Sequence, residues 1–404
     1  MTISARSTII ETVAGIGEPG YAGDGGPAHA ASLNEPKGLA VDAEGHLYIA
    51  DSENHVIRRV DRLTGLISTI AGSGHGGSMQ APTPHPVGAR EAHDIEDDPL
   101  GEASAGQEPA FSQVADLSGT VRFVTGGSAG KPRFAGDGGP ALDALLNFPT
   151  AVAVDTHGNV YIADTMNHRI RMVEAATGLI RTIAGTGHPR CSGDGGPAVS
   201  ATLQDPAAIA IDRQGHLYIA DQSNNRIRAV DLRTGLISTV AGNGTAAYNG
   251  DDMPAVEACL AGPSGLALGP DGSLYIADTF NGRIRCVHLE TGTIQTVAGD
   301  GGEYRFQDGE ESVSLSRPYG IAVDHHGNIF LTDSDSHLLR VFDKIRRVTG
   351  RAAGVGTASF SGDGGPAELA GFSYPFGVAI DDRETIFVAD TFNHRIRRLN
   401  REVS

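Results

Sequence analysis

The sequence predicts an all-β protein that folds as a closed β-propeller of six four-stranded blades. A phrase of the type Leu-Tyr-Ile-Ala-Asp recurs six times, and the last four intervals between its Asp residues are 57, 57, 55 and 57 residues. A fixed internal period indicates a repeat architecture. No window places apolar residues at helical spacing, so helix is at most a minor component. The repeated acids are Asp51, Asp164, Asp221, Asp278, Asp333 and Asp390.

Each unit contains four short apolar runs with turn residues between them, the pattern of a propeller blade. Gly45 and Gly65 mark two of the turns in the first unit, because glycine readily adopts positive φ. The four strands expected in that unit are 38–42, 47–50, 56–60 and 66–71.

The two ends of the chain are expected to complete one blade together. The last unit runs out after its third strand, at residues 395–399. The missing fourth strand appears at the other end of the chain, where residues 10–15 match the pattern of residues 67–72. Pairing these ends would close the ring and remove the exposed sheet edges that invite aggregation.

The first interval departs from the period. Asp51 and Asp164 are 113 residues apart, which is almost two periods. Residues 114–126 resemble the end of a unit, but residues 78–109 are rich in Pro, Gly, Ala and acid and lack strand alternation. We therefore favour a single propeller domain over residues 1–404, with residues 73–126 as an insertion after the first full blade. Seven blades, one of them degenerate, remain the alternative.

Two stretches carry a family resemblance. Residues 164–171 (Asp-Thr-Met-Asn-His-Arg-Ile-Arg) and 390–397 (Asp-Thr-Phe-Asn-His-Arg-Ile-Arg) resemble NHL repeats, as do Pro-x-Gly starts such as Pro36-Lys37-Gly38. The resemblance covers the chain apart from about residues 73–112 and implies a β-propeller, most often six-bladed. The family and its wider relatives include protein- and RNA-binding modules, lyases and hydrolases, so the fold does not select a function.

Composition restricts the partners. The chain has 31 basic and 49 acidic residues, a net charge of −18. Nucleic acids and anionic membranes demand a basic surface, so we expect neither as the main partner. The first residues lack the apolar core of a signal peptide and no apolar stretch reaches spanning length, so we expect a cytoplasmic protein. We also expect it to be a monomer. Three separated cysteines indicate neither a disulfide framework nor a zinc site.

Two repeated features are interpreted as structural. The sequence Gly-Asp-Gly-Gly-Pro-Ala could cradle an ion or phosphate, but its presence in most units favours a loop between the outer strand of one blade and the inner strand of the next. An Arg follows every repeated Asp by seven positions, and we expect ion pairs that set the blade register. The four full copies of the glycine-rich motif begin at Gly23, Gly136, Gly193 and Gly362.

Function is expected where the repeats differ. The loop before the first strand and the loop after the second lie on one face, around the mouth of the central channel. Lys37 and Glu53 occupy variable positions on one side of this mouth, and Tyr319 and Asp335 occupy them on another. The remaining sides are small or apolar, which is typical of a small-ligand site. If the site is catalytic, Glu53 or Asp335 would be the base and Lys37 or Tyr319 the acid or electrophilic partner.

His55, His168, His337 and His394 share one repeat position and form a candidate metal site for Zn²⁺ or Fe²⁺. The alternative is a turn residue bonded to backbone. His85, His93 and the acidic run 94–98 of the insertion form a solvated segment, a lid, or a source of carboxylates for a hard cation.

Two functions follow. The first is a rigid propeller that binds a protein or small molecule at the loop face. The alternative is a lyase or hydrolase, metal-assisted or acid/base, acting on a small molecule at the same mouth. The sequence names no cofactor, and a divalent metal ion is the one that the histidine ring would suit.

Overall fold

The computed structural model describes residues 8–74, 112–115, 121–124, 134–302 and 314–400. The chain forms two compact units, residues 1–76 with 133–404, and residues 77–132. In the second unit, the described residues form an antiparallel hairpin of β6 (Ser112–Ala115) and β7 (Val121–Val124). The predicted insertion, residues 73–126, overlaps this unit, and its segment 78–109 lies outside the described residues.

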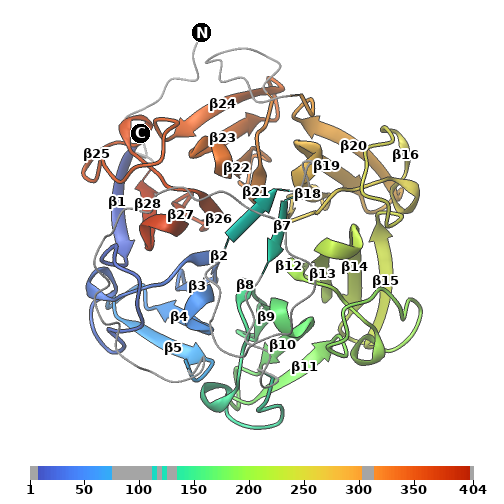
Figure 1. The fold of residues 1–404 in the computed structure, drawn as a ribbon, viewed down its shortest axis with the longest axis horizontal. Helices are drawn as coiled ribbons and strands as arrows, with labels where there is room; N and C mark the ends of the chain where they lie inside the picture. The colour runs from blue at the N-terminus through green and yellow to red at the C-terminus, as the bar shows by residue number, and fades with distance from the viewer. Residues whose placement is uncertain (1–7, 75–111, 116–120, 125–133, 303–313, 401–404) are drawn as a thin grey trace, which may run out of the picture. The chain divides into compact units, whose positions relative to one another are not determined.

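The first unit contains six antiparallel sheets arranged around one axis (Figure 1). We number them as blades 1 to 6 in chain order. Blade 1 has β2 (Pro36–Val41), β3 (Leu47–Asp51), β4 (Val56–Val60) and β5 (Ile67–Ala71). Blade 2 has β8 (Pro149–Val154), β9 (Val160–Asp164), β10 (Arg169–Val173) and β11 (Ile180–Ala184). Blade 3 has β12 (Pro206–Ile211), β13 (His216–Asp221), β14 (Arg226–Asp231) and β15 (Leu236–Ala241).

The remaining blades follow the same order. Blade 4 has β17 (Gly265–Leu268), β18 (Leu274–Asp278), β19 (Arg283–His288) and β20 (Thr293–Ala298), with β16 (Met253–Pro254) beside β20. Blade 5 has β21 (Pro318–Val323), β22 (Ile329–Asp333), β23 (Leu338–Asp343) and β24 (Val348–Ala353). Blade 6 has β26 (Pro375–Ile380), β27 (Ile386–Asp390), β28 (Arg395–Asn400), β1 (Ile9–Ala14) and β25 (Gly365–Pro366).

Blade 6 joins the two ends of the described chain. Strand β1 pairs antiparallel with β28, with Ile10 opposite Leu399, and Figure 1 shows this blue strand beside the red ones. The predicted closure is confirmed. The described residues form six blades, so the expectation of six is confirmed and the seven-blade alternative is wrong. Residues 114–126 resembled the end of a blade, but their described part pairs only within the β6–β7 hairpin.

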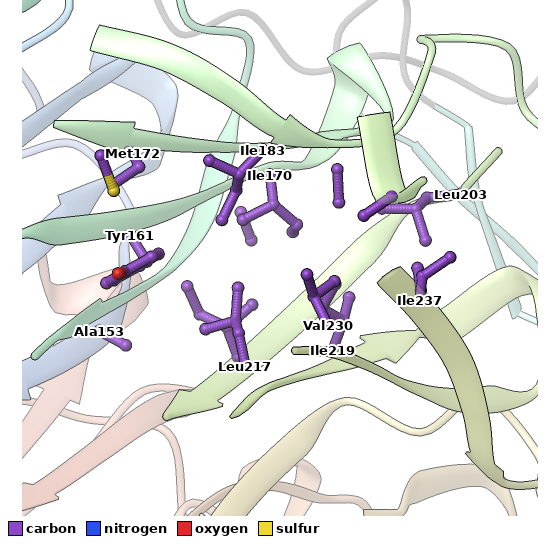
Figure 2. Packing of buried hydrophobic residues seen from close by; sticks show 14 of the residues in the cluster. Ala153, Tyr161, Ile170, Met172, Ile183, Leu203, Leu217, Ile219, Val230 and Ile237 are labelled. Carbon is purple, nitrogen blue, oxygen red and sulfur yellow. The ribbon is translucent and has the colours of Figure 1, made fainter. Parts of the chain in front are cut away.

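The core lies between neighbouring blades. Side chains alternate along each strand, so the two faces of a blade pack on different neighbours. On β9, Tyr161 belongs to a cluster shared with blade 3, whereas Ile162 belongs to one shared with blade 1. Figure 2 shows Tyr161 and Met172 of blade 2 in the same cluster as Leu217 and Val230 of blade 3. Apolar residues on both faces of each strand are therefore needed for every blade junction.

Short 3-10 helices connect the strands. One set follows the second strand of each blade: η2 (Ser52–Asn54), η4 (Thr165–Asn167), η6 (Gln222–Asn224), η8 (Thr279–Asn281), η9 (Ser334–Ser336) and η11 (Thr391–Asn393). The other set precedes the first strand: η1 (Ala28–Ala30), η3 (Ala141–Asp143), η5 (Ala198–Ser200), η7 (Ala255–Glu257) and η10 (Ala367–Leu369). Among the described residues, no helix has the length and apolar character needed to cross a membrane.

Candidate functional site

The repeated Asp organises the loop that follows the second strand of each blade. In blade 1, Asp51 accepts hydrogen bonds from the Asn34 backbone N–H at 2.7 Å and from Asn54 Nδ2 at 2.8 Å. Arg58 Nη1 lies 3.4 Å from the same carboxylate, and both side chains are fully buried. The predicted Asp–Arg ion pair is confirmed in all six blades, with N–O distances between 2.8 and 3.5 Å.

The same Arg also anchors the glycine-rich loop. Arg58 Nη2 lies 2.7 Å from Asp24 of the Gly-Asp-Gly-Gly-Pro-Ala motif, and Pro27 of that motif bridges to Leu66 beside the outer strand. Equivalent pairs occur in blades 2, 3, 4 and 6 at 2.6–3.0 Å. The structural interpretation of the motif is confirmed, but the contact between the two repeated phrases was not predicted.

Burial dominates the electrostatics of these acids. Desolvation raises the pKa of Asp51, Asp164, Asp221 and Asp390 to about 6, against the opposing effects of their hydrogen bonds and of the Arg charges. Burial also raises the pKa of Asp278. These carboxylates have no exposed surface, so they hold the fold together and do not meet a ligand.

The four predicted metal-site histidines connect adjacent blades. Each adopts a left-handed backbone conformation, with φ between 51° and 56°, at the end of a 3-10 helix. Each Nδ1 accepts a hydrogen bond from the backbone N–H directly before the first strand of the next blade. The pairs are His55 with Phe148 at 2.9 Å, His168 with Asp205 at 3.2 Å, His337 with Tyr374 at 3.1 Å and His394 with Glu35 at 3.2 Å.

This bond requires a neutral imidazole, because a protonated Nδ1 cannot accept. Burial lowers the pKa of His168, His337 and His394, which favours the neutral form. In blade 3 the same bond is made by Asn225, whose Oδ1 accepts from the Gly262 N–H at 2.9 Å. Within the described ranges, none of the four histidines belongs to a group of three potential metal ligands, and metal binding by them stays a prediction.

A second hydrogen bond connects adjacent blades and was not predicted from the sequence. The residue directly after the repeated Asp is Ser or Thr in five blades, and its hydroxyl donates to the Pro carbonyl that opens the next blade. Thr165, for example, bonds the Pro206 carbonyl at 2.8 Å. Blade 3 departs, with Gln222 at this position. A hydroxyl at this position in five blades was the feature of the sequence that could have predicted the bond. The hydroxyl groups lie 2.6–2.9 Å from the proline carbonyl oxygens in Ser52, Thr165, Thr279, Ser334 and Thr391.

Four of the six residues that directly precede the opening prolines occupy strained positions at the mouth. Glu35, Phe148, Asp205 and Tyr374 adopt φ between 46° and 53°, a region that bulky L-residues rarely adopt. Their N–H groups are the ones bonded by the histidines, so the interblade bonds stabilise the strain. In the sequence, only the residue after each proline was interpreted as a site position, although the residue before it varies from Glu to Phe, Asp and Tyr.

The central channel is narrow because the inner strands approach closely. A Cβ at Gly377 would overlap the Lys37 carbonyl oxygen, and a Cβ at Gly320 would overlap that of Phe376. The cavity on the axis has a volume of about 70 Å³. Pockets for drug-sized ligands measure roughly 300–1,000 Å³, so the channel interior accommodates only a few waters or an ion.

Lys37 and Tyr319 line this channel and lie on either side of Phe376. Lys37 Nζ lies 4.8 Å from the Phe376 ring centre, and the Tyr319 ring centre lies 4.4 Å from it. Burial lowers the pKa of Lys37, although Glu35, whose Oε2 accepts from Nζ at 3.1 Å, and Glu53 oppose the shift. Burial raises the pKa of Tyr319.

The four predicted catalytic residues fall into two groups. Glu53 lies close enough to Lys37 to affect its pKa, so these two are brought together as expected. Asp335 instead pairs with Arg317, whose Nη1 lies 3.7 Å from Oδ1. Arg317 also stacks on Phe280, with Cζ 5.4 Å from the ring centre. Catalysis by these residues stays a prediction.

Aromatic side chains and Lys37 form a continuous group across blades 2, 1, 6 and 5. On one side of this group, Lys37 Nζ makes a cation–π contact with Phe148, 5.0 Å from the ring centre. On the other, Phe376 and Tyr374 contact Phe392 with ring centres 6.2 and 5.3 Å apart. The Phe392 side chain is 39% exposed. We call this group the mouth arc, defined as Lys37, Phe148, Tyr319, Tyr374, Phe376 and Phe392.

Comparison with known proteins identifies the family. A model of the teneurin NHL domain matches residues 7–98, 121–192 and 186–247, and an NHL repeat model matches residues 260–287. This chain belongs to the NHL-repeat β-propeller family. The resemblance seen in the sequence is therefore confirmed.

Similar proteins are longer than this chain. The chain is 31% identical over 286 residues to Protein SUPPRESSOR OF QUENCHING 1, chloroplastic, of Arabidopsis thaliana, covering 68% of this chain and 27% of that protein. It is 29% identical over 314 residues to human NHL repeat-containing protein 2, covering 70% of this chain and 43% of that one. The chain thus spans less than half of these relatives.

Solved structures share the fold of this NHL propeller at low identity. An auxiliary nutrient binding protein from Bacteroides thetaiotaomicron has a TM-score of 0.61 at 15% identity, covering 97% of this chain and 76% of that one. A gluconolactonase from Xanthomonas campestris has a TM-score of 0.52 at 13% identity, covering 98% and 92%. At such identities the likeness concerns the fold alone.

Proposed function

We propose that this NHL propeller is a binding module that recognises an extended segment of a partner protein across the mouth arc. Aromatic side chains supply large contact area at low entropic cost and are enriched in protein interfaces. The arc places exposed Phe392 beside half-buried Tyr374 and beside Phe376, and Phe376 in turn contacts half-buried Tyr319 and the Lys37 ammonium group. This arrangement is the single observation that carries the proposal.

Two further features support a surface site over a deep pocket. The axial cavity of about 70 Å³ is too small for a drug-sized ligand, so a ligand must contact the rim. The rim itself is held rigid, because Phe148 and Tyr374 occupy strained conformations that the interblade histidines stabilise. A preformed surface loses little entropy on binding, which favours affinity.

The test is site-directed crosslinking. A photoreactive phenylalanine at position 392 should capture a partner from extracts of the source cells, and unlabelled purified protein should compete for it. The control position is Leu63, which is 90% exposed in the turn between β4 and β5, at the opposite end of the strands. A Phe392→Ser variant should compete at least tenfold less well than the wild type, and Leu63→Ser should compete fully. Equal capture at both positions would refute the proposal.

A second function is favoured by one observation. The lowered pKa of Lys37 and its proximity to Glu35 and Glu53 are features of acid/base sites. In this alternative, Lys37 and Glu53 would act on a small molecule held at the mouth, as in a lyase or hydrolase. A screen of small lactones, esters and glycosidic or cyclic substrates with wild type and Lys37→Met distinguishes the two, because only an enzyme loses turnover in the variant.

A further inference from the structure

A group of three potential ligands lies at the other end of the propeller. The turn between β21 and β22 in blade 5 carries His325 and His326, and the turn between β26 and β27 in blade 6 carries Glu384. The first two strands of each blade are antiparallel, and the repeated Asp marks the mouth end of the second strand. The turns that join these strands therefore lie at the end away from the mouth. This group is separate from the mouth arc and from the histidine ring.

Glu384 breaks a rule that the other blades follow. The five corresponding turns place glycine at this position, with φ between 76° and 86°: Gly45, Gly158, Gly215, Gly272 and Gly327. Glu384 adopts φ 62° in the same place, in the left-handed region that favours glycine. Hydrogen bonds from Arg383 and Thr385 to Asp381 complete this turn without the Glu384 carboxylate. A strained glutamate at a glycine position indicates that the carboxylate has another use.

That carboxylate reaches the two histidines of the neighbouring blade. Its Oε1 lies 2.8 Å from His325 Nδ1 and 3.9 Å from His326 Nε2. The two imidazole centres are 3.9 Å apart. One donor atom from each of the three residues lies within 4.8 Å of the others, and within the described ranges this is the one such group of three. Adjacent histidines in this turn occur in blade 5 and not in the other five blades.

We propose that His325, His326 and Glu384 bind a divalent first-row transition metal, with Zn²⁺ as the reference ion, across the junction of blades 5 and 6. Two imidazoles and one carboxylate suit Zn²⁺, Co²⁺, Ni²⁺ or Cu²⁺ better than Mg²⁺ or Ca²⁺, which prefer oxygen ligands. Zn–N and Zn–O bonds of about 2.1 Å place tetrahedral ligands roughly 3.4 Å apart, so the 3.9 Å separation from His326 must decrease and the 2.8 Å separation from His325 must increase. The histidine side chains are 61% and 62% exposed and can make this adjustment, with water completing the coordination.

A metal between blades 5 and 6 would stabilise the closed ring. Blade 6 contains the β1–β28 pairing that joins the two ends of the chain, and blade 5 is its neighbour. A metal that links their turns therefore stabilises the ring beside its closure. At a Zn²⁺ concentration one hundredfold above Kd, the expected rise in Tm is about 3 °C for a chain of this length.

The experiment uses the full chain, stripped with EDTA and dialysed, and titrated with ZnCl₂ by calorimetry and with CoCl₂ by absorption. The variants are His325→Ala, His326→Ala and Glu384→Gly. The control is His157→Ala, which removes a histidine from the corresponding turn of blade 2, where no such group occurs among the described residues. Wild type and His157→Ala should bind one more equivalent of Zn²⁺ than each of the three variants.

The Glu384→Gly variant distinguishes loss of the metal site from misfolding. Glycine is the residue of the other five turns and relieves the strained φ, so this variant should melt at or above the temperature of the metal-free wild type. It should nonetheless lose the Zn²⁺-dependent rise in Tm and the Co²⁺ absorption band. The proposal is overturned if the wild type shows no Zn²⁺-dependent rise, or if Glu384→Gly retains the full equivalent of bound metal.

Discussion

Asp164→Asn tests the claim that the buried acid of each blade is a structural centre. Asp164 accepts the Asn147 N–H at 2.7 Å and Asn167 Nδ2 at 2.9 Å, and lies 3.5 Å from Arg171 Nη1. Asparagine has the same shape and can keep the first bond. Its amide group, however, would face the donors of Asn167 and Arg171, so the variant loses one hydrogen bond and the charge partner together.

The expected cost is about 3 kcal/mol, the lower end of the range for breaking a buried ion pair. The lower end applies because Arg171 keeps Asp137 at 2.7 Å and donates to the Leu145 and Ala135 carbonyl groups. With an unfolding entropy of about 2.1 cal/mol/K per residue, this corresponds to a fall in Tm of about 3–4 °C. Asp137→Asn is the matched control, because its side chain is 34% exposed and its loss should cost no more than about 1 kcal/mol.

The assay is thermal and urea denaturation at pH 7.5 of the wild type, each single variant and the double variant. The two sites share Arg171, so the double variant should be less stable than the sum of the single effects predicts. Equal losses for Asp164→Asn and Asp137→Asn would show that burial does not determine the cost. No loss for Asp164→Asn would refute the interpretation of the network as structural.

Three further predictions concern the blade junctions. Replacing His168, His337 and His394 with Asn, the residue that makes this bond in blade 3, should weaken the pH dependence of the stability. Burial lowers the pKa values of the three histidines, so the wild type loses stability as the pH falls below about 6.5. Between pH 7.5 and pH 5.5, the Tm of the wild type should fall by more than the Tm of the variant. Both proteins contain the same buried acids, so identical changes in Tm would contradict the prediction. Gly377→Ala should lower Tm by more than Asp164→Asn, because the added methyl would meet a backbone carbonyl of the next inner strand; an unchanged melting curve would show that the strands can separate. Thr165→Val should cost about 1–2 kcal/mol by urea denaturation, because it removes the hydroxyl that bonds the buried Pro206 carbonyl at 2.8 Å and Thr150 Oγ1 at 2.6 Å; a neutral effect would mean that these bonds do not contribute.

Part of the candidate site could be predicted from the repeat. The positions inside Pro-x-Gly were expected at the channel mouth, and Lys37 and Tyr319 do line it. The residues before the prolines were overlooked, because their importance comes from a backbone conformation that is rare for Phe148 or Tyr374. Nor could the partner of Asp335 be predicted, since Arg317 stands at the same position before a proline, where the other blades carry no basic residue.

The sequence by itself determined the strands, the blade repeat and the pairing of the two chain ends. These features follow from local patterns: alternating apolar residues, turn residues at a constant spacing, and one strand displaced to the other terminus. Tertiary structure alone decided the partners across each junction. His394 bonds the N–H of Glu35, which lies 359 positions away, and Glu384 meets His325 in the neighbouring blade. Such contacts depend on separations of about 3 Å that exist only after the ring closes, and spacing along the chain does not encode them.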